Sequence, residues 1–249
     1  MKKILTVDYK QAVQIGLLIA LLAISAFIIK SLHDKIYDNA SIDKEWDYVS
    51  ILMPFKPARR GYSILIDLDI LTLTLYKNGA EYKQWPISGG TPDTPSPIGS
   101  WLVTDIENWG SSFGGSWIGL NVPWGQYGIH GTTQPWAVGS RNISHGCIRM
   151  RNADVAELKE IISVGTPVHI KYDNVPFRNL AKGEIGSDVL ILQVMLMKLG
   201  LYSDVVDGKF GTSTFSAVYQ FQTHEKLTPD GIVGIQTWSL LQKRVGNGY

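Results

Sequence analysis

The sequence contains one cysteine in 249 residues, which excludes an internal disulfide and any metal or redox site built on paired cysteines. Charge imbalance is also lacking, because 23 basic and 22 acidic side chains give a net charge of +1. A general nucleic-acid binder would need a clustered excess of Lys and Arg. Charged residues make up only 18% of the chain, below the usual quarter, so some part of it must be unusually apolar.

The apolar excess lies near the N-terminus, where residues 12–29 contain only two polar side chains, Gln14 and Ser25. A helix of this length spans about 27 Å, close to the hydrocarbon thickness of a bilayer. Lysines at positions 2, 3 and 10 are typical of a cytoplasmic flank. We therefore expect residues 1–29 to be a cytoplasmic stub and a transmembrane signal anchor (helix 12–29), with the rest of the chain on the outer face of the cell membrane. A cleaved signal peptide, giving a secreted protein, and a buried soluble helix are the alternatives.

The middle of the chain changes from a linker to strand patterns. Residues 30–60 are charged and show little periodicity, which predicts a juxtamembrane linker. Alternation of period two begins at Tyr62, and Asn78-Gly79 predicts a type I′ turn between two strands. Residues 87–147 hold twelve glycines, five prolines and four charged side chains, which favours turns over helices. With a short helix capped by Asn152 and a strand over 167–170, we expect a mainly-β domain at 61–172.

Beyond residue 173 the apolar period becomes helical. Ser187 is expected to cap a first helix and Gly200 to end it. An Asp-Gly turn then occurs twice at an offset of 23 residues, at Asp207 and Asp230, each time leading into a helix. The sequence thus predicts an α+β multidomain protein: a transmembrane helix, a mainly-β domain and an all-α three-helix module over 179–242. The module has no cysteine and one histidine, which indicates binding and not catalysis.

The chemistry of the mainly-β domain is expected around Cys147, which has His130 and His145 close to it in the sequence. A thiol becomes a useful nucleophile when it ionises, which needs a nearby histidine and backbone N–H groups around the sulfur. A tight turn at Gly146 would free main-chain N–H groups to hold an oxyanion. These residues predict acyl transfer through a thioester, with Cys147 as nucleophile and His130 as base.

Two other roles for the same residues stay open on spacing alone. One is an inert buried cysteine with two structural histidines. The other is a zinc site made by His130, His145 and Cys147, which would need His169 or Asp67 as a fourth ligand. The sequence has no HExxH or CxxC motif to support zinc, and no G-x-S-x-G motif to support a serine hydrolase.

Two parts of the chain resemble known bacterial families. Residues 130–132 (His-Gly-Thr) and 144–150 (Ser-His-Gly-Cys-Ile-Arg-Met) are similar to the signature of L,D-transpeptidases, the YkuD-type catalytic domain. The stretches T-P-S-P-I-G at 94–99 and W-I-G-L at 117–120 also fit that pattern, and the resemblance runs over 63–172. Residues 179–242 resemble the three-helix peptidoglycan-binding module, with its D-G-x-x-G-x-x-T repeats.

The resemblance implies a role for each residue of the motif. Cys147 becomes the nucleophile and His130 the proton shuttle, with the carbonyl of Gly131 orienting the imidazole. The oxyanion and positioning residues are His145, Gly146, Gly131 and Ser144.

Substrate binding is expected from Arg149, Tyr127 and Trp117. A guanidinium matches a substrate carboxylate, and a structural ion pair is the alternative role of Arg149. The six tryptophans between residues 85 and 136 either line a substrate groove or, for the most part, fill the core.

The activity implied by the resemblance is that of a peptidoglycan L,D-transpeptidase. Its thiolate attacks the carbonyl of the third residue of a stem tetrapeptide, D-Ala leaves, and an amine of a second stem forms a 3–3 cross-link. Water as the acceptor would give an L,D-carboxypeptidase. No metal or organic cofactor is expected, and the partners are stem peptides and glycan strands. A non-catalytic cell-wall anchoring protein and a zinc-dependent wall hydrolase are the remaining alternatives.

Overall fold

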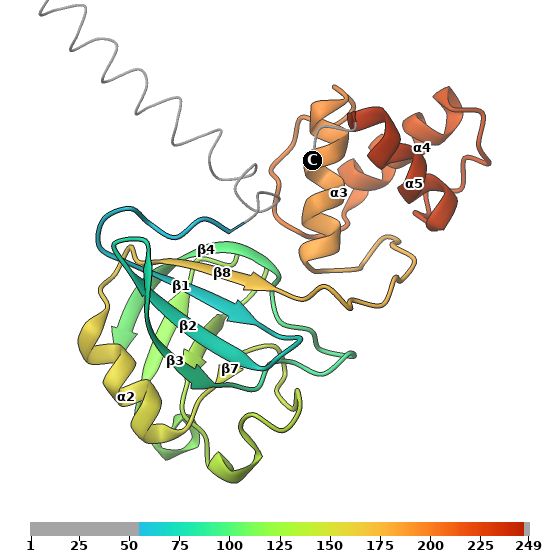
Figure 1. Ribbon diagram of the computed structural model, residues 1–249. Coiled ribbons are helices and arrows are strands. Elements are labelled where there is room, and N and C mark those ends of the chain that lie inside the picture. Colours follow the sequence, from blue (N-terminus) through green and yellow to red (C-terminus); the bar gives the residue numbers. More distant parts are fainter. Residues whose placement is uncertain (1–54, 247–249) are drawn as a thin grey trace, which may run out of the picture. The chain divides into compact units, whose positions relative to one another are not determined.

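The computed structural model describes residues 55–246. The transmembrane helix expected at 12–29 and most of the linker expected at 30–60 lie outside these residues. In the part of the chain that is described, no helix is both long and apolar enough to cross a membrane. The described residues form a mainly-β domain followed by a helical module (Figure 1). The change of period near residue 173 therefore marks a real change of architecture.

The mainly-β domain is built on one sheet of eight strands in the order β3-β2-β1-β8-β4-β5-β6-β7. The pairs β1–β8 and β6–β7 are parallel, and the other neighbouring pairs are antiparallel. Its elements are β1 (Tyr62–Asp67), β2 (Thr72–Lys77), β3 (Ala80–Pro86), β4 (Gly99–Glu107), η1 (Ser111–Phe113), β5 (Trp117–Leu120), β6 (Tyr127–His130), η2 (Pro135–Ala137), β7 (Ile148–Arg149), α2 (Asn152–Ile161) and β8 (Pro167–Lys171).

The β2–β3 hairpin has the turn that its sequence predicts. Asn78 and Gly79 both have positive φ, at 53° and 87°, as a type I′ turn requires. The side chain of Asn78 also accepts a hydrogen bond from the backbone N–H of Gly61 at 2.8 Å, which ties the turn to the start of β1. The alternating pattern places Leu73 and Leu75 in the core, with no exposed surface.

Strand β4 joins the two halves of the sheet. Its first four residues pair with β8 and its later residues pair with β5, with a register shift between Val103 and Ile106. Such a shift bends a strand and strengthens its twist. Figure 1 shows β1, β2, β3 and β8 together on the near side of the domain. This bend positions β6 and β7, which carry the expected catalytic residues.

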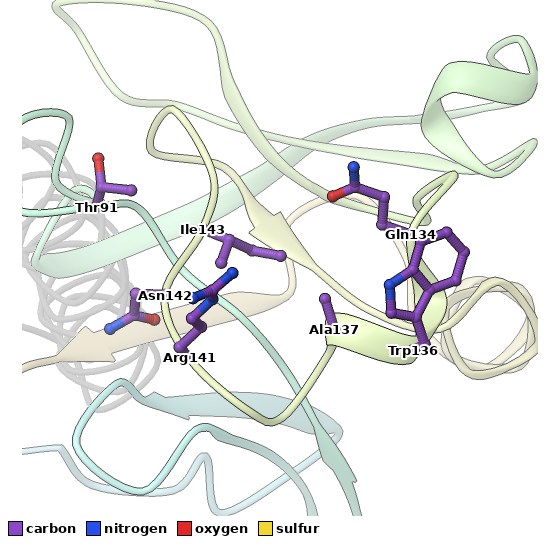
Figure 2. A pocket seen from close by; sticks show the side chains of 7 residues that line it. All are labelled: Thr91, Gln134, Trp136, Ala137, Arg141, Asn142 and Ile143. Atoms are coloured by element: carbon purple, nitrogen blue, oxygen red, sulfur yellow. The ribbon is translucent and has the colours of Figure 1, made fainter.

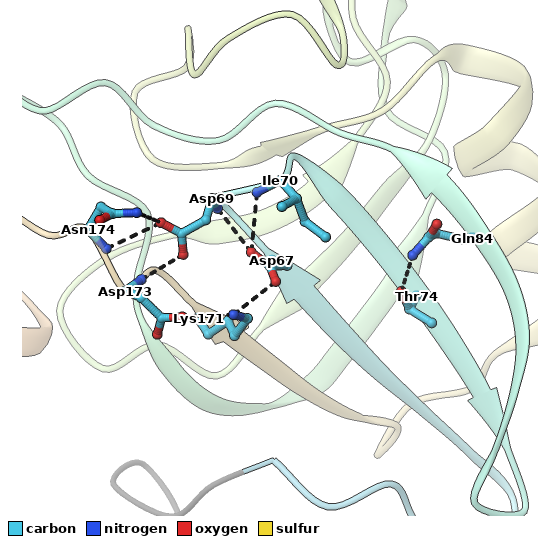
Figure 3. A network of polar contacts seen from close by, with 8 residues as sticks. All are labelled: Asp67, Asp69, Ile70, Thr74, Gln84, Lys171, Asp173 and Asn174. Atoms are coloured by element: carbon cyan, nitrogen blue, oxygen red, sulfur yellow. Dashed lines mark hydrogen bonds and ion pairs between the residues drawn. The ribbon is translucent and has the colours of Figure 1, made fainter.

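A polar network fixes the loop after β1 to the end of β8, and the sequence patterns did not reveal it (Figure 3). Asp67 accepts hydrogen bonds from the backbone of Asp69 and Ile70 and forms an ion pair with Lys171 at 2.9 Å. Asp69 in turn accepts hydrogen bonds from residues 173 and 174. Asp67 therefore has a structural role.

The helical module contains α3 (Ser187–Lys198), α4 (Thr212–His224) and α5 (Ile235–Val245), as the repeat predicted. Both Asp-Gly turns form: Gly208 and Gly231 have φ of 68° and 72°. In each turn the aspartate carboxylate accepts a hydrogen bond from the backbone N–H two residues later, at 2.9 Å. The two copies thus share one local structure.

Two buried glutamines hold these turns. The side chain of Gln193 bonds to Asp207, Gly208 and Thr214 among others, and that of Gln222 makes the equivalent bonds to Asp230, Gly231 and Thr237. Both are almost fully buried, at 0% and 2% exposure. Because each amide is satisfied on both its oxygen and its nitrogen, the network stabilises the core instead of costing free energy.

Two expected helix caps are wrong, and one helix end is confirmed. Helix α3 is capped by Gly186, with Ser187 as its first residue, and the buried Ser187 hydroxyl has no partner within the described residues. Helix α2 likewise starts at Asn152 after an Arg151 cap, because the Asn152 side chain bonds elsewhere. Gly200 does follow the end of α3, with φ of 72°.

Candidate active site

The pairing of β6 with β7 brings Cys147 and His130 to the same face of the sheet. The two strands are parallel, with Ile129 opposite Ile148 and His130 opposite Arg149. Side chains alternate between faces, and Ile129 and Ile148 point into the core with at most 1% exposure. His130 and Arg149 must therefore point to the other face. Extending the same register sets Cys147 beside Gly128 on that face, two residue pairs away from the pair of His130 and Arg149.

The imidazole of His130 is held in one orientation by its own chain. Its Nδ1 atom lies 2.5 Å from the carbonyl oxygen of Gly131, as expected for this position. Since a carbonyl can only accept, Nδ1 carries the hydrogen and Nε2 keeps its lone pair for a proton. The Phe113 ring packs edge-on against the imidazole with 4.9 Å between the ring centroids, and the Trp117 ring stacks on it with 5.9 Å between centroids. His130 is consequently only 6% exposed and suited to act as a base through Nε2.

Trp117 differs from its expected role in substrate binding. It is 2% exposed and lies between His130 and Trp109, whose ring stacks on it in parallel at 4.0 Å. A methyl group on Gly128 would come within 2.7 Å of the Trp117 ring, so only glycine leaves room for this packing. Trp117 therefore positions His130 and is not available to a substrate.

Among the other tryptophans, some fill the core, as the sequence analysis expected for most of them, and one is exposed. Trp85 and Trp101 are 4% exposed and belong to the core. Trp136 is 77% exposed, so it alone among the tryptophans of residues 85–136 lies largely in solvent.

The loop before Cys147 is fixed by Ser144, which is 1% exposed. The Ser144 hydroxyl donates to the carbonyl of Cys147 at 2.5 Å and accepts from the backbone N–H of Gly146 at 3.0 Å. Ser144 therefore supports the loop as expected, but its bond occupies the Gly146 N–H. Within residues 55–246, the backbone N–H groups of His145 and Cys147 have no acceptor. Those two groups are the candidate oxyanion donors.

Gly146 is required by conformation and by close packing. Its φ is +113°, a region that disfavours other residues. A Cβ there would lie 2.6 Å from the ring of Tyr127 and 3.2 Å from the carbonyl of Pro95. The half-buried Tyr127 thus covers the turn next to Cys147. The role of Tyr127 in substrate binding stays a prediction, and the close approach at Gly146 is to this ring.

Burial favours the uncharged forms of both reacting groups. Burial lowers the pKa of His130, the Gly131 carbonyl raises it, and the positive charge of Arg149 lowers it again. Burial raises the pKa of Cys147, whereas a hydrogen bond from the Gly128 backbone and the charge of Arg149 lower it. Both groups are thus shifted toward their uncharged forms, and the thiol must lose its proton when it attacks.

Arg149 lies half-buried on the same face as His130. Its backbone pairs with Ser88, which fixes β7 against the chain after β3. Among the described residues the guanidinium has no acidic partner within 4.0 Å and no hydrogen bond. The structural ion pair considered as an alternative is therefore not formed there, and the charge is free to meet an anion.

Asn152 is a positioning residue that the sequence analysis missed. Its side-chain oxygen accepts from the backbone N–H of Thr132 at 2.8 Å, and it packs so tightly that a Cβ on Gly114 or Gly131 would clash with it. Asn152 thereby joins the start of α2 to the loop that follows His130. The only sequence signal was a polar residue at a helix start, which we interpreted as a cap.

The structure does not gather the four residues of the zinc alternative. No three His, Cys, Asp or Glu side chains in residues 55–246 are placed to share one ion. His145 is exposed, and His169 lies on β8 with its Nδ1 2.8 Å from the hydroxyl of Ser100. Asp67 belongs to the loop network of Figure 3. His145 thus contributes its backbone to the site more directly than its side chain.

Comparisons with known proteins agree with the division of the chain. A family model described as the L,D-transpeptidase catalytic domain matches residues 61–170. A second model, of a peptidoglycan binding domain, matches residues 185–241.

Relatives and solved structures cover the catalytic domain. A Bacillus licheniformis protein assigned as L,D-transpeptidase YkuD is 39% identical over 124 residues, which is 49% of this chain and 73% of that protein. The Bacillus subtilis YkuD protein is 40% identical over 110 residues, covering 44% of this chain and 65% of its own. The crystal structure of L,D-transpeptidase 3 from Mycobacterium tuberculosis aligns with a TM-score of 0.40 and 21% identity, over 45% of this chain and 61% of that one. The chain thus spans less than two thirds of the solved chain.

Proposed function

Because this chain belongs to the YkuD family of L,D-transpeptidases, we propose that it forms 3–3 cross-links in peptidoglycan through a thioester on Cys147. The acyl donor is a stem tetrapeptide and the acceptor is an amine of a second stem. The observation that carries the proposal is the placement of Cys147 and His130 on one face of paired strands, with Nε2 of His130 left free to take a proton.

The proposed reaction has two half-reactions with the same parts. The Cys147 sulfur attacks the carbonyl of the third stem residue while Nε2 of His130 takes the thiol proton. The N–H groups of His145 and Cys147 hold the oxyanion. When the C–N bond breaks, His130 returns the proton to the departing D-Ala amine. The acceptor amine then attacks the thioester, gives a proton to His130, and the thiol forms again as the sulfur leaves and regains that proton.

The experiment is mass spectrometry of the products from a purified disaccharide-tetrapeptide. A dimer that has lost one D-Ala and is joined 3–3 supports the proposal. A tripeptide monomer instead would mean that water is the acceptor, and the protein would be an L,D-carboxypeptidase. Unchanged substrate with wild-type protein would refute both activities and leave the wall-anchoring alternative. Activity lost to EDTA but insensitive to iodoacetamide would favour a zinc hydrolase.

The helical module is proposed to hold the enzyme on the wall. The support for this role is the match of residues 185–241 to a peptidoglycan binding domain and the helical fold of α3, α4 and α5. Removing residues 179–249 should reduce retention on insoluble sacculi and leave turnover of soluble stem peptides within about twofold. Equal loss in both assays would mean that the module supports the catalytic fold.

We also propose that residues 12–29 anchor the protein in the cell membrane with the catalytic domain outside. The support is the length and apolar character of this segment and the lysines before it. Added protease should degrade the catalytic domain on spheroplasts, and carbonate washing should leave the protein in the membrane fraction. N-terminal sequencing of the cellular protein distinguishes an anchor from a cleaved signal.

A further inference from the structure

A cavity of about 580 Å³ lies beside the loop that carries Cys147 (Figure 2). We call it the Arg141 cavity. Gln134 and Trp136 line one side of it, and Arg141, Asn142 and Thr91 line the other. None of the residues that we assign to the reaction lines it. The cavity is thus a separate compartment next to the reacting groups.

The Arg141 cavity is complementary to an anion. Arg141 is its one charged lining residue, and within residues 55–246 the guanidinium has neither an ion pair nor a hydrogen bond. The side-chain oxygen of Asn142 accepts from the backbone of Gly89 at 2.7 Å, which fixes the amide and leaves its NH₂ group without an acceptor among the described residues. A guanidinium and an adjacent amide donor match the two oxygens of a carboxylate.

Trp136 gives the cavity an apolar wall. It is 77% exposed, whereas Trp85, Trp101 and Trp117 are at most 4% exposed. The short helix η2 holds it there, so the exposed ring is placed by the backbone. Exposed aromatic rings next to polar groups are typical of binding surfaces, because they add contact area at a small entropic cost.

The wall of the cavity is bonded directly to the catalytic loop. The backbone N–H of Thr91 and the hydroxyl of Thr94 both donate to the carbonyl of Ser144, at 3.0 and 3.1 Å. Ser144 in turn holds Gly146 and Cys147 through its hydroxyl. A group bound in the cavity would therefore lie against the same segment that sets the oxyanion donors.

The distance between cavity and sulfur fits one stem peptide. Three residues lie between Cys147 and Ile143, which lines the cavity, and the four steps along the chain span at most about 14 Å. An extended peptide covers about 3.3–3.6 Å per residue, so a tetrapeptide with its reacting carbonyl at Cys147 can place another of its residues in the cavity. Arg149, whose charge acts on both Cys147 and His130, lies nearer to the scissile bond.

We propose that the Arg141 cavity binds a carboxylate of the donor stem peptide that lies before the scissile bond in the sequence of the stem, with Arg141 as the specificity residue. This proposal rests on the proposed function, since it names the substrate group that the same site reads. Arg149 then serves the carboxylate next to the scissile bond, and the two arginines fix the peptide at two points. Two-point binding places the third-residue carbonyl at the sulfur.

The test compares stem tetrapeptides in which one carboxyl at a time is converted to its amide. Binding is measured by calorimetry on Cys147→Ala and on Cys147→Ala/Arg141→Gln, and turnover on wild type and Arg141→Gln. The unmodified peptide should bind about ten- to a hundredfold more weakly to the Arg141→Gln protein. One of the amidated peptides, with its amide before the scissile bond, should bind more weakly by a similar factor to the protein that keeps Arg141. For that same peptide, Arg141→Gln should cause no further loss of affinity. In turnover, KM should rise while kcat changes little.

Two controls keep the result specific to this cavity. Arg60→Gln, at an exposed arginine before β1, removes the same charge elsewhere and should leave affinity within about twofold. Arg141→Lys keeps the charge but loses the two-pronged geometry, so its affinity should be intermediate. Equal loss for every amidated peptide, no loss in Arg141→Gln, or coupling only to the carboxyl after the scissile bond would overturn the inference. Because binding is measured without turnover, an inactive wild type would refute the proposed function alone.

Discussion

The helical module and the catalytic domain differ in whether the polar groups at the centre of each have partners, namely the two buried glutamines of the module and the backbone beside Cys147. In the helical module, Gln193 and Gln222 are almost completely buried and every polar atom of their amides has a partner. In the catalytic domain, the His145 and Cys147 N–H groups, within the described residues, have none. A fully hydrogen-bonded network stabilises one fold. Backbone N–H groups without an acceptor, and the free lone pair on Nε2 of His130, can instead bind a ligand. The comparison explains why chemistry is expected in one region only.

The largest effect should distinguish the buried His130 from the half-buried His169. His130→Gln removes the base on the site face and should lower kcat/KM by about 10²–10⁴-fold, because general base catalysis contributes that much. His169→Gln, at a half-buried ring that bonds to Ser100, should leave kcat/KM within about threefold. Steady-state kinetics on a stem tetrapeptide, with circular dichroism to verify folding, measures both. Similar losses in the two variants would mean that His130 acts through the fold.

The next largest effect should be one of stability in the module. Gln193→Leu keeps the volume but leaves the buried N–H groups of Asp207 and Gly208 without an acceptor, which should cost about 2–4 kcal/mol of unfolding free energy. Gln236→Leu on the exposed side of α5 is the matched control, with an expected change within about 0.5 kcal/mol. Chemical denaturation measures the difference, and turnover of soluble peptide should persist in both. If catalysis fell with the module, the two regions would not be independent.

A smaller effect is expected at Asn152, whose hydrogen bond to the Thr132 N–H holds the loop that orients His130. Asn152→Ala removes the acceptor of the Thr132 N–H and should lower kcat about tenfold, by loosening the loop that bears Gly131. Asn152→Asp keeps an acceptor oxygen and should retain most of the activity. Stopped-flow acylation would show the loss in the chemical step. An equal loss in the Asp variant would point to charge instead of positioning.

The smallest effect is a shift in pH dependence. Activity needs neutral His130, whose pKa is lowered by burial, so kcat/KM should fall only as the pH drops below about 6.5. Arg149→Gln removes a charge that lowers the pKa of His130 and of Cys147, so the acid limb should move to higher pH. An acid limb that stays in place in Arg149→Gln would mean that the titrating group is not His130.

Much of the fold followed from local patterns in the sequence. Asn78-Gly79 predicted its hairpin, and the Asp207 and Asp230 turns predicted the module, because each depends on residues that favour one local conformation. The helix caps at Asn152 and Ser187 were wrong, since each residue is the first of its helix, and the Asn152 side chain bonds instead to the backbone N–H of Thr132. Local propensity cannot register a competing bond from a distant loop.

The candidate site was predictable in its reacting residues and less so in its surroundings. Cys147 and His130 carried their chemistry in their type and motif, and their roles stay predictions that the variants above test. Trp117 was expected to meet substrate, but it packs behind His130, because the pairing of β5 with β6 fixes its side. Arg141 and Trp136 had no motif at all. Their importance depends on a cavity that exists only in three dimensions.

The central claim is that the acyl group passes through the sulfur of Cys147, and the intact mass of the protein after mixing with a stem tetrapeptide tests it most directly. The account predicts a transient adduct that adds the mass of the peptide minus the mass of D-Ala, which leaves with the thiol hydrogen on its amine, and digestion should map the adduct to Cys147. It should build up slowly in His130→Gln, be absent in Cys147→Ala, and disappear when an acceptor amine is added. Product formation by Cys147→Ala at the wild-type rate would contradict the account.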